Sequence, residues 1–447
     1  MIYDLAVIGG GPAGYSAAFK AVKNNLSVIL FEKDKIGGTC LNRGCIPTKC
    51  LIYSSQLFQK LSSGFKHGIS VSDCAYDYQK ILERKNEVVE SLKSSIEKQL
   101  KKEKITIVYQ QARICKNNII KTDTDSYKAK NILIAAGSKV AKVPVKGIDK
   151  AITSDDILEK DIDLKDSYII IGGGIIGVEL ATVLLNLNKQ VTILEVADQI
   201  VANMDREISQ KLTILLKKQN CSIITKASVT EIVENNEVKI VKYLDKNGNE
   251  FYLSAQEVIT ATGRIANTDN LFDNIEIEIN RGIITDSNYQ TGIRNIYAIG
   301  DVRSGNIQLA HVAIAQAENV IDVILNKEKT ISENTIPSCI YTNTEIASIG
   351  LTENAAGNIG INTYTRKILT GLNGKCLIED SENGYIKLVF NSDNDILIGA
   401  QLLCNDATNI VGELALAVEN RLTLEQIKKT IHPHPTIVEM IWDSCKQ

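Results

Sequence analysis

Two cysteines separated by four residues are the most reactive pair of side chains in the sequence. They lie in the run Gly37-Gly38-Thr39-Cys40-Leu41-Asn42-Arg43-Gly44-Cys45-Ile46-Pro47-Thr48-Lys49. Gly44 and Pro47 supply the backbone freedom and the constraint that cysteines this close need in order to bond. The spacing does not suit zinc, and so short a loop would stabilise the fold little as a structural disulfide. We therefore predict a disulfide that opens and closes during a reaction.

A second reactive pattern lies near the C-terminus, in the run His432-Pro433-His434-Pro435-Thr436-Ile437-Val438-Glu439. Thiol exchange needs a base that makes a thiolate from a substrate dithiol, and an imidazole oriented by a carboxylate suits that task. Glu439 follows His434 by five residues and could turn back onto it across one helical turn. The pattern alone leaves open a proline-rich turn with surface histidines.

A glycine-rich pattern occurs twice at a constant offset. The matched pairs, each 163 residues apart, are Gly9 and Gly172, Gly11 and Gly174, Gly14 and Gly177, and Glu32 and Glu195. Each copy follows an apolar segment, opens a helical pattern and reaches its acidic residue 18 positions after its last glycine. This is the full βαβ unit that binds dinucleotides: the glycines allow the turn, the approach of a pyrophosphate and helix packing, and the carboxylate binds a ribose. Two glycine turns without a ligand are the weaker alternative.

Two dinucleotide sites and one redox disulfide together predict an electron path between nicotinamide, flavin and sulfur. We assign FAD to the first site, because the cysteine pair follows it directly and must touch the flavin. The second site should then hold the nicotinamide. Glu195 favours NAD over NADP, since a carboxylate binds a free 2′-hydroxyl and repels a 2′-phosphate, and no arginine follows it closely.

These residues need strands and helices to position them. Residues 132–138, 258–264 and 296–301 are predicted to be strands that end in glycine turns, and residues 83–102 to form a charged amphipathic helix on the flank of the first domain. From residue 336 strands alternate with later helices. The predicted fold class is α/β, with two Rossmann-like dinucleotide-binding domains and a C-terminal α+β domain.

Composition excludes several other classes of protein. The chain has 447 residues, 44% of them hydrophobic, and a net charge of -3 with both signs mixed along it. This argues against a nucleic-acid partner and against a membrane partner. An apolar strand is predicted almost directly after Met1, so we expect no signal or transit peptide. Eight of the ten cysteines are scattered, as expected for a reducing compartment, and we expect a cytoplasmic location.

With these motifs in view, residues 3–442 resemble the pyridine nucleotide-disulfide oxidoreductases, and most closely those members that oxidise dihydrolipoamide with NAD. The motifs that carry the resemblance are the cysteine run, both glycine patterns, AIGDV at 298–302, LAH at 309–311 and HPTIVE at 434–439. The resemblance implies an FAD-binding domain at 1–145, an NAD-binding domain at 146–264, a second FAD-binding part at 265–335 and a dimerisation domain at 336–447.

The resemblance also implies a role for each matching residue. Cys40 would exchange with the substrate, Cys45 would face the flavin, and Lys49 and Glu179 would form an ion pair near it. The implied FAD contacts are Gly9, Gly11, Gly14, Glu32, Lys33, Gly38, Thr39, Lys49, Ala112, Ala136, Gly137, Ser138, Asp301, Leu309, Ala310 and His311. The implied NAD contacts are Gly172, Gly174, Ile175, Ile176, Gly177, Glu179, Glu195, Val229 and Gly263. No metal site is implied.

In this family His434 would be the catalytic base and Glu439 its partner, acting on the cysteines of the other subunit of a homodimer. The implied second partner is the lipoyl-bearing protein of a 2-oxo acid dehydrogenase, acetoin dehydrogenase or glycine cleavage complex. Arg43 departs from the family pattern, in which many members carry an apolar residue; it could lower the pKa of a thiol or face solvent.

Several other activities remain alternatives at this point. A glutathione- or trypanothione-type reductase would use NADPH, which Glu195 disfavours. A mercuric reductase would carry paired cysteines near the end of the chain, where only Cys445 is present. A flavin transhydrogenase would not require the cysteine pair, and a flavoprotein that acts only as a scaffold would not require Cys45 or His434.

Overall fold

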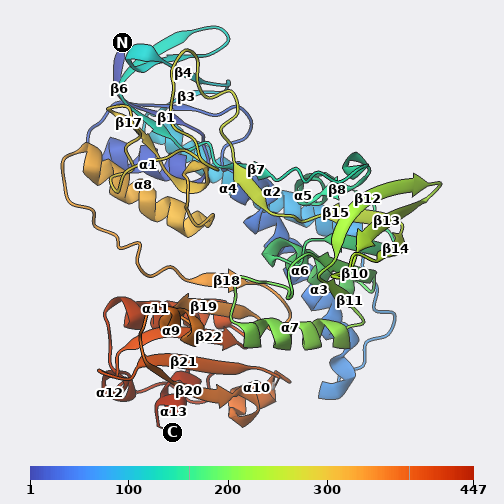
Figure 1. Cartoon of the computed structure of the whole chain (residues 1–447). Coiled ribbons are helices and arrows are strands. Elements are labelled where there is room, and N and C mark those ends of the chain that lie inside the picture. The colour runs from blue at the N-terminus through green and yellow to red at the C-terminus, as the bar shows by residue number, and fades with distance from the viewer. Residues whose placement is uncertain (161, 382, 447) are drawn as a thin grey trace.

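The computed structural model describes residues 1–160, 162–381 and 383–446 (Figure 1). The fold is mixed α/β, as predicted. In Figure 1 the beginning of the chain and the segment near residue 300 share the upper part, the middle of the chain lies to the right, and the C-terminal part forms the base. Among the described residues no helix is both long and apolar enough to cross a membrane.

The first sheet is centred on β1 (Ile2–Ile8). The order of its strands is β3 (Thr106–Val108), β2 (Val28–Phe31), β1, β6 (Ser126–Ile134), β5 (Ile119–Lys121) and β4 (Arg113–Cys115), with β17 (Ile296–Ala298) also paired to β6. Leu5, Ala6 and Val7 are fully buried, because both faces of this parallel region are covered. Along the chain, β17 follows all the strands of the second sheet. Two separate stretches of chain therefore form the first sheet. The domain boundaries named above stay a prediction.

The second sheet repeats the parallel arrangement of the first. Its order is β11 (Ser222–Thr225), β10 (Gln190–Glu195), β9 (Ser167–Ile171), β15 (Glu257–Thr260) and β8 (Ile152–Thr153). A three-stranded antiparallel sheet of β12 (Ser228–Asn235), β13 (Val238–Leu244) and β14 (Glu250–Ala255) follows β11 along the chain. The carboxyl ends of β1 and β9 each lead into a glycine turn and a helix, α1 (Pro12–Lys23) and α6 (Ile175–Asn186).

The two glycine turns have the same backbone conformation and the same close contacts. Gly9 and Gly172 both have a φ of 110°, a backbone conformation that residues other than glycine rarely adopt. A Cβ added at Gly14 would lie 1.8 Å from the carbonyl oxygen of Gly9, and one at Gly177 would lie 2.0 Å from that of Gly172. The third glycine of each pattern therefore permits the close packing of helix on strand that the sequence repeat predicts.

The cysteines lie in α2 (Gly38–Arg43) and α3 (Cys45–Ser62), which pack against α4 (Tyr78–Lys102) and α5 (Ser154–Glu159). Helix α3 packs against α4 and α6. Helix α4 begins five residues before the predicted start at residue 83, because the Asp77 side chain accepts hydrogen bonds from the backbone N–H groups of Gln79 and Lys80. The short helix α5 begins with a capping box between Thr153 and Asp156.

The C-terminal part is an antiparallel sheet covered by helices. Its order is β18 (Ser338–Ile340), β19 (Ile346–Gly350), β22 (Leu397–Leu403), β21 (Tyr385–Asn391) and β20 (Thr363–Leu369). Its helices are α9 (Glu353–Asn358), α10 (Gly374–Ile378), α11 (Ala407–Glu419), α12 (Leu424–Lys428) and α13 (Glu439–Cys445). The remaining elements are α7 (Arg206–Lys218), α8 (Ala310–Ile324), the paired strands β7 (Ser138–Val140) and β16 (Arg264–Ala266), and short 3-10 helices at Gly64–His67, Lys116–Asn118, Ile148–Lys150, Gly300–Val302 and Thr370–Leu372.

Candidate active site

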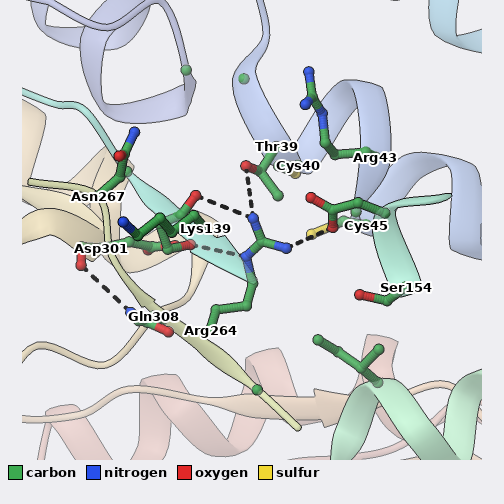
Figure 2. A pocket seen from close by; sticks show the side chains of 18 of the residues that line it. Thr39, Cys40, Arg43, Cys45, Lys139, Ser154, Arg264, Asn267, Asp301 and Gln308 are labelled. Atoms are coloured by element: carbon green, nitrogen blue, oxygen red, sulfur yellow. Dashed lines mark hydrogen bonds and ion pairs between the residues drawn. The ribbon is translucent and has the colours of Figure 1, made fainter. Parts of the chain in front are cut away.

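One cavity of about 1820 Å³ runs along the glycine turns of both parallel sheets and past the cysteine pair. Figure 2 shows the part of it around Cys40, Cys45 and Arg264. It brings together nearly all of the side chains that the sequence predicts for the site. Of the predicted residues, those that do not line it are Gly14 and Gly177, which pack helix on strand, and His434 and Glu439. The two nucleotide patterns and the cysteines thus share one continuous space.

The cysteines lie where two helices meet. Cys40 is in α2, Cys45 begins α3, and both are free thiols that line the cavity. The Cys40 thiol donates a hydrogen bond to the sulfur of Cys45; this bond and burial raise the pKa of Cys40. The same hydrogen bond, opposed by burial and aided by the charge of Lys49, lowers the pKa of Cys45 to about 7. Cys45 is therefore the thiol of the reduced pair that ionises near neutral pH.

Lys49 and Glu179 form the predicted ion pair. The Lys49 Nζ atom lies 3.0 and 2.9 Å from the two carboxylate oxygens of Glu179, whose side chain is only 5% exposed. The backbone N–H of Tyr341 also donates to Glu179, at 3.0 Å, and Lys49 lies over the Tyr341 ring. The pair therefore joins α3, α6 and the C-terminal sheet at the wall of the cavity.

The two acidic residues that end the glycine patterns have the same partners. Glu32 accepts hydrogen bonds from the backbone N–H groups of Gly10 at 2.7 Å and Asp34 at 2.8 Å. Glu195 accepts them from Gly173 at 2.5 Å and Ala197 at 2.7 Å. Burial raises the pKa of Glu32, and these backbone donors oppose the rise. Both carboxylates line the cavity, and each oxygen keeps a lone pair for a ribose hydroxyl.

The space beside the middle glycine of each pattern also fits a dinucleotide. A Cβ at Gly174 would meet no atom within 4 Å, and one at Gly11 would meet only the Cα of Gly38, at 3.7 Å. The middle glycine of each pattern therefore faces open space at a helix N-terminus, as the approach of a pyrophosphate requires. These residues fit FAD and a nicotinamide dinucleotide. Within the described residues, no group of three or more His, Cys, Asp or Glu side chains could hold a metal ion.

Arg264 was not predicted, although it occupies the centre of the cavity wall (Figure 2). Its guanidinium donates to the Ser138 hydroxyl at 3.0 Å, the Ser138 carbonyl at 3.1 Å, Asp155 at 2.7 Å and Thr39 at 3.3 Å. The Ser138 hydroxyl donates in turn to Asp301, at 2.7 Å. Burial raises the pKa of Asp301, while the Ser138 hydrogen bond and the charge of Arg264 lower it. Arg264 thus orders the predicted FAD contacts Thr39, Ser138 and Asp301.

The sequence signal for Arg264 is its position directly after Gly263, the predicted NAD contact at the end of a strand. Asp155 has no comparable signal, because nothing in its local pattern distinguishes it from the surface acids around it.

His434 and Glu439 lie in the C-terminal part and contact each other as predicted. The His434 Nδ1 atom lies 2.9 Å from a carboxylate oxygen of Glu439. Glu439 is buried and also accepts hydrogen bonds from the Asn373 amide at 3.3 Å and the Thr436 N–H at 3.2 Å. The His434 side chain is 77% exposed and does not line the cavity of its own chain. The imidazole is oriented but directed to the outside of this chain.

Two family models match most of this chain. Residues 3–317 match the family model described as pyridine nucleotide-disulphide oxidoreductase, and residues 336–445 match the dimerisation domain of the same family. The chain belongs to the pyridine nucleotide-disulphide oxidoreductase family. It is therefore an oxidoreductase of a family that uses FAD and NAD(H), and its dimerisation domain supports a homodimer.

Similar proteins extend over the whole length of the chain. The dihydrolipoyl dehydrogenase of Mycoplasma genitalium is 34% identical and aligns with 100% of this chain and 98% of its own. That of Bacillus subtilis is 32% identical over 99% of this chain and 97% of its own. Among solved structures, the HOCl-induced flavoprotein disulfide reductase RclA from Escherichia coli matches with a TM-score of 0.88 and 25% identity, over 99% of both chains. The relatives thus include more than one kind of disulfide enzyme.

Proposed function

We propose that the protein oxidises dihydrolipoamide to lipoamide with NAD⁺, through a disulfide between Cys40 and Cys45 and through FAD. The observation that carries the proposal is the single cavity that Cys40 and Cys45 share with both nucleotide patterns. Full-length relatives named dihydrolipoyl dehydrogenase support the choice of substrate.

The proposed exchange begins with the oxidised pair. His434 of one subunit takes a proton from a substrate thiol, and the resulting thiolate attacks the sulfur of Cys40 in the other subunit. The Cys40–Cys45 bond breaks, and Cys45 leaves as a thiolate that Lys49 stabilises. The second substrate thiol gives up its proton and attacks the mixed disulfide, which releases lipoamide and leaves Cys40 as a thiol. Two substrate thiols are oxidised and one protein disulfide is reduced.

When bound, FAD would accept the electron pair from the reduced cysteines and deliver it to NAD⁺ as a hydride. The chain contributes the rest: Glu32, Asp301 and Arg264 with its partners order the FAD side, and Glu195 favours NAD over NADP. Glu439 holds the His434 imidazole in one orientation.

We further propose that the substrate is carried by the lipoyl-bearing protein of a 2-oxo acid dehydrogenase, acetoin dehydrogenase or glycine cleavage complex. We expect the reaction to take place in the cytoplasm, where a reducing environment keeps the scattered cysteines as thiols.

The test is NAD-linked oxidation of dihydrolipoamide by the purified flavoprotein, measured beside NADPH-linked reduction of oxidised glutathione. We expect fast NADH formation that is abolished in Cys45→Ser and falls about 100-fold or more in His434→Gln, since a general base contributes about that much. The likeness to a flavoprotein disulfide reductase makes reduction of another disulfide the second candidate. Negligible NADH formation with an intact flavin and a reducible pair would favour that candidate.

A further inference from the structure

The segment that leads from β10 into α7 lies against the second glycine turn. This segment, residues 200–205, is here called the strap. The backbone N–H of Val201 donates to the carbonyl oxygen of Gly173 at 2.8 Å. The next two residues, Ala202 and Asn203, are exposed and line the cavity. The strap therefore forms part of the wall of the predicted site for the nicotinamide dinucleotide.

The strap lies beside the carboxylate that ends the second glycine pattern. A Cβ added at Gly173 would lie 2.8 Å from Cγ2 of Ile200 and 3.2 Å from Cβ of Glu195, so both side chains pack against the same residue. Gly173 also donates its backbone N–H to Glu195, at 2.5 Å. Because Glu195 is the predicted ligand of the adenosine ribose, the strap borders the adenosine half of the dinucleotide.

The backbone of the strap is strained at Val201. Its φ of 43° lies in the left-handed region, which β-branched residues rarely adopt. Such a conformation persists only where the surrounding structure holds it, and it is found most often at ligand-binding sites. Within the strap, the Val201 carbonyl accepts a hydrogen bond from the backbone N–H of Met204 at 2.8 Å. The strap therefore depends on restraint from the elements around it.

The dimerisation domain supplies a restraint through Lys387, a buried cation in β21. The Lys387 side chain is 6% exposed, and its Nζ atom lies 3.0 Å from the carboxylate of Asp205, the last residue of the strap. Asp205 in turn caps α7, since its side chain accepts a hydrogen bond from the backbone N–H of Glu207 at 2.8 Å. Separating a buried ion pair is strongly unfavourable, so this contact fixes the end of the strap.

Two further contacts tie the same end of the strap to the dimerisation domain. The Ser348 hydroxyl in β19 donates to the sulfur of Met204 at 3.6 Å, and Lys367 in β20 pairs with Glu207 at the start of α7. In Figure 1, α7 lies next to the C-terminal sheet. Three strands of that sheet thus hold a segment that lines the predicted NAD site.

Lys387 has a second carboxylate at the same distance, and this one lies within its own domain. Glu353 in α9 is 3.0 Å from the Lys387 Nζ atom, and Glu207 is 3.5 Å from it. Loss of either Asp205 or Glu353 therefore removes one negative charge beside the same ammonium group. Only the loss of Asp205 breaks the contact with the strap itself.

We propose that Lys387 is a positioning residue that fixes the strap beside the second glycine turn, so that the dimerisation domain sets the affinity for the adenosine half of the nicotinamide dinucleotide. Lys387 does not line the cavity, so it acts through the strap. This inference rests on the NAD site proposed above and adds a distant residue to it.

The test measures binding without turnover. ADP-ribose, which carries the adenosine half but cannot accept a hydride, is titrated calorimetrically into the flavin-containing enzyme. We expect Asp205→Asn to raise the Kd about tenfold, the effect of leaving the strap in place in about one molecule in ten. Asparagine caps helices as well as aspartate does, so α7 keeps its start. Glu353→Gln should leave the Kd unchanged, and Lys387→Met should weaken binding at least as much as Asp205→Asn.

The direction of the change separates position from charge. If the carboxylates acted directly on the anionic ligand, Asp205→Asn and Glu353→Gln would each remove a repulsion and both would bind ADP-ribose more tightly. Hydrogen exchange gives a second readout, because the Val201 N–H should exchange faster in Asp205→Asn and not in Glu353→Gln. Lys20→Met is the control for losing a largely buried lysine, since Lys20 pairs with Asp322, 2.7 Å away in α8.

Weaker binding and faster exchange in Asp205→Asn, with no change in Glu353→Gln and Lys20→Met, support the proposal. An unchanged Kd in Asp205→Asn, equal weakening in Glu353→Gln or in the control, or tighter binding in both carboxylate variants would overturn it. A wild-type enzyme that binds no ADP-ribose would instead overturn the proposed NAD site.

Discussion

At the scale of the residue, the charge of Cys45 depends on one hydrogen bond and one cation. The Cys40 thiol donates the hydrogen bond, and Lys49 supplies the positive charge, which together lower the pKa of Cys45 to about 7. A thiolate is the better leaving group and electron donor, so this ionisation sets the pH range in which the reduced pair is reactive. The lowered pKa extends the reactivity of Cys45 to a lower pH than that of an ordinary cysteine.

Removing the charge of Lys49 should therefore move this titration. In Lys49→Met we expect the pKa of Cys45 to rise from about 7 toward the ordinary value of a free cysteine, about 8.5, because an opposite charge no longer favours the thiolate. The measurement is the ultraviolet absorbance of the thiolate during a pH titration of the reduced protein, with Cys45→Ser as the blank. Lys49→Arg keeps the charge and should retain most of the effect; an unchanged curve in Lys49→Met would contradict the prediction.

The sequence predicts residues well where a motif fixes their chemistry and poorly where only the tertiary fold does. The cysteines and the two carboxylates that end the glycine patterns are marked by spacing, and all four line the cavity. The only sequence signal for Arg264 is the glycine before it. Asp155 has no sequence signal, because its contact with Arg264 depends on where α5 places it. Their contact joins segments that no local pattern connects.

At the scale of the element, each βαβ unit uses its three glycines differently. At Gly177 a side chain would collide with the backbone of Gly172, whereas at Gly174 it would extend into open space. Many strand and helix bounds follow from local signals of this kind. Helix α4 begins at Tyr78, before the predicted start at residue 83, because Asp77 caps its N-terminus. The sequence does not reveal that β17 pairs with β6, because that contact bridges residues far apart.

The two glycines of the second unit give a matched pair of variants. We expect Gly177→Ala to destabilise the fold by about 1–3 kcal/mol, as overpacking does, because α6 must move away from β9. Gly174→Ala should leave the stability unchanged and weaken NADH binding, because its methyl group takes the place of the pyrophosphate. Thermal unfolding and quenching of NADH fluorescence measure the two effects. Equal loss of stability in both variants would refute the distinction.

At the scale of the whole molecule, His434 does not line the cavity of its own chain that holds the cysteines. The His434 side chain, held by Glu439, is 77% exposed. Phe65 and Ile378 are also largely exposed, at 72% and 64%, on segments that His67 and Asp380 bring together. An exposed, oriented imidazole and exposed apolar side chains are what the proposed homodimer with shared sites requires.

Mixed dimers test this arrangement. Cys45→Ser and His434→Gln subunits, each inactive alone, are unfolded, mixed in equal amounts and refolded. If each site takes its cysteines from one subunit and its histidine from the other, half of the dimers contain one intact site, and activity should return to about a quarter of wild type. Dimers that exchange subunits and yet stay inactive would place both groups in one chain. Refolded wild-type enzyme serves as the reference.

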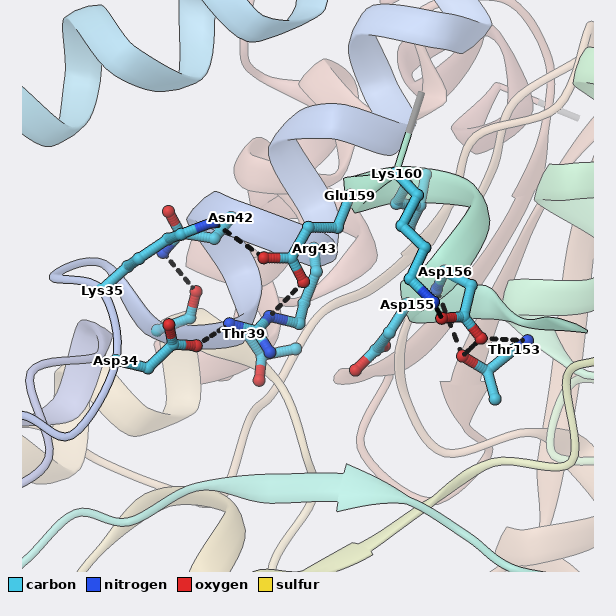
Figure 3. A network of polar contacts seen from close by, with 12 residues as sticks. Asp34, Lys35, Thr39, Asn42, Arg43, Thr153, Asp155, Asp156, Glu159 and Lys160 are labelled. Atoms are coloured by element: carbon cyan, nitrogen blue, oxygen red, sulfur yellow. Dashed lines mark hydrogen bonds and ion pairs between the residues drawn. The ribbon is translucent and has the colours of Figure 1, made fainter. Parts of the chain in front are cut away.

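The helix α5 described above has a consequence for how such an enzyme can change. Asp155 and Glu159 are four residues apart on one face, and they anchor Arg264 on the nucleotide side and Arg43 beside the cysteines. A single helical turn therefore contacts two arginines that lie far apart in the sequence. Figure 3 shows this turn beside Arg43, which also pairs with Asp34. Substitutions in this turn would therefore change the surroundings of the nucleotide side and of the cysteines together.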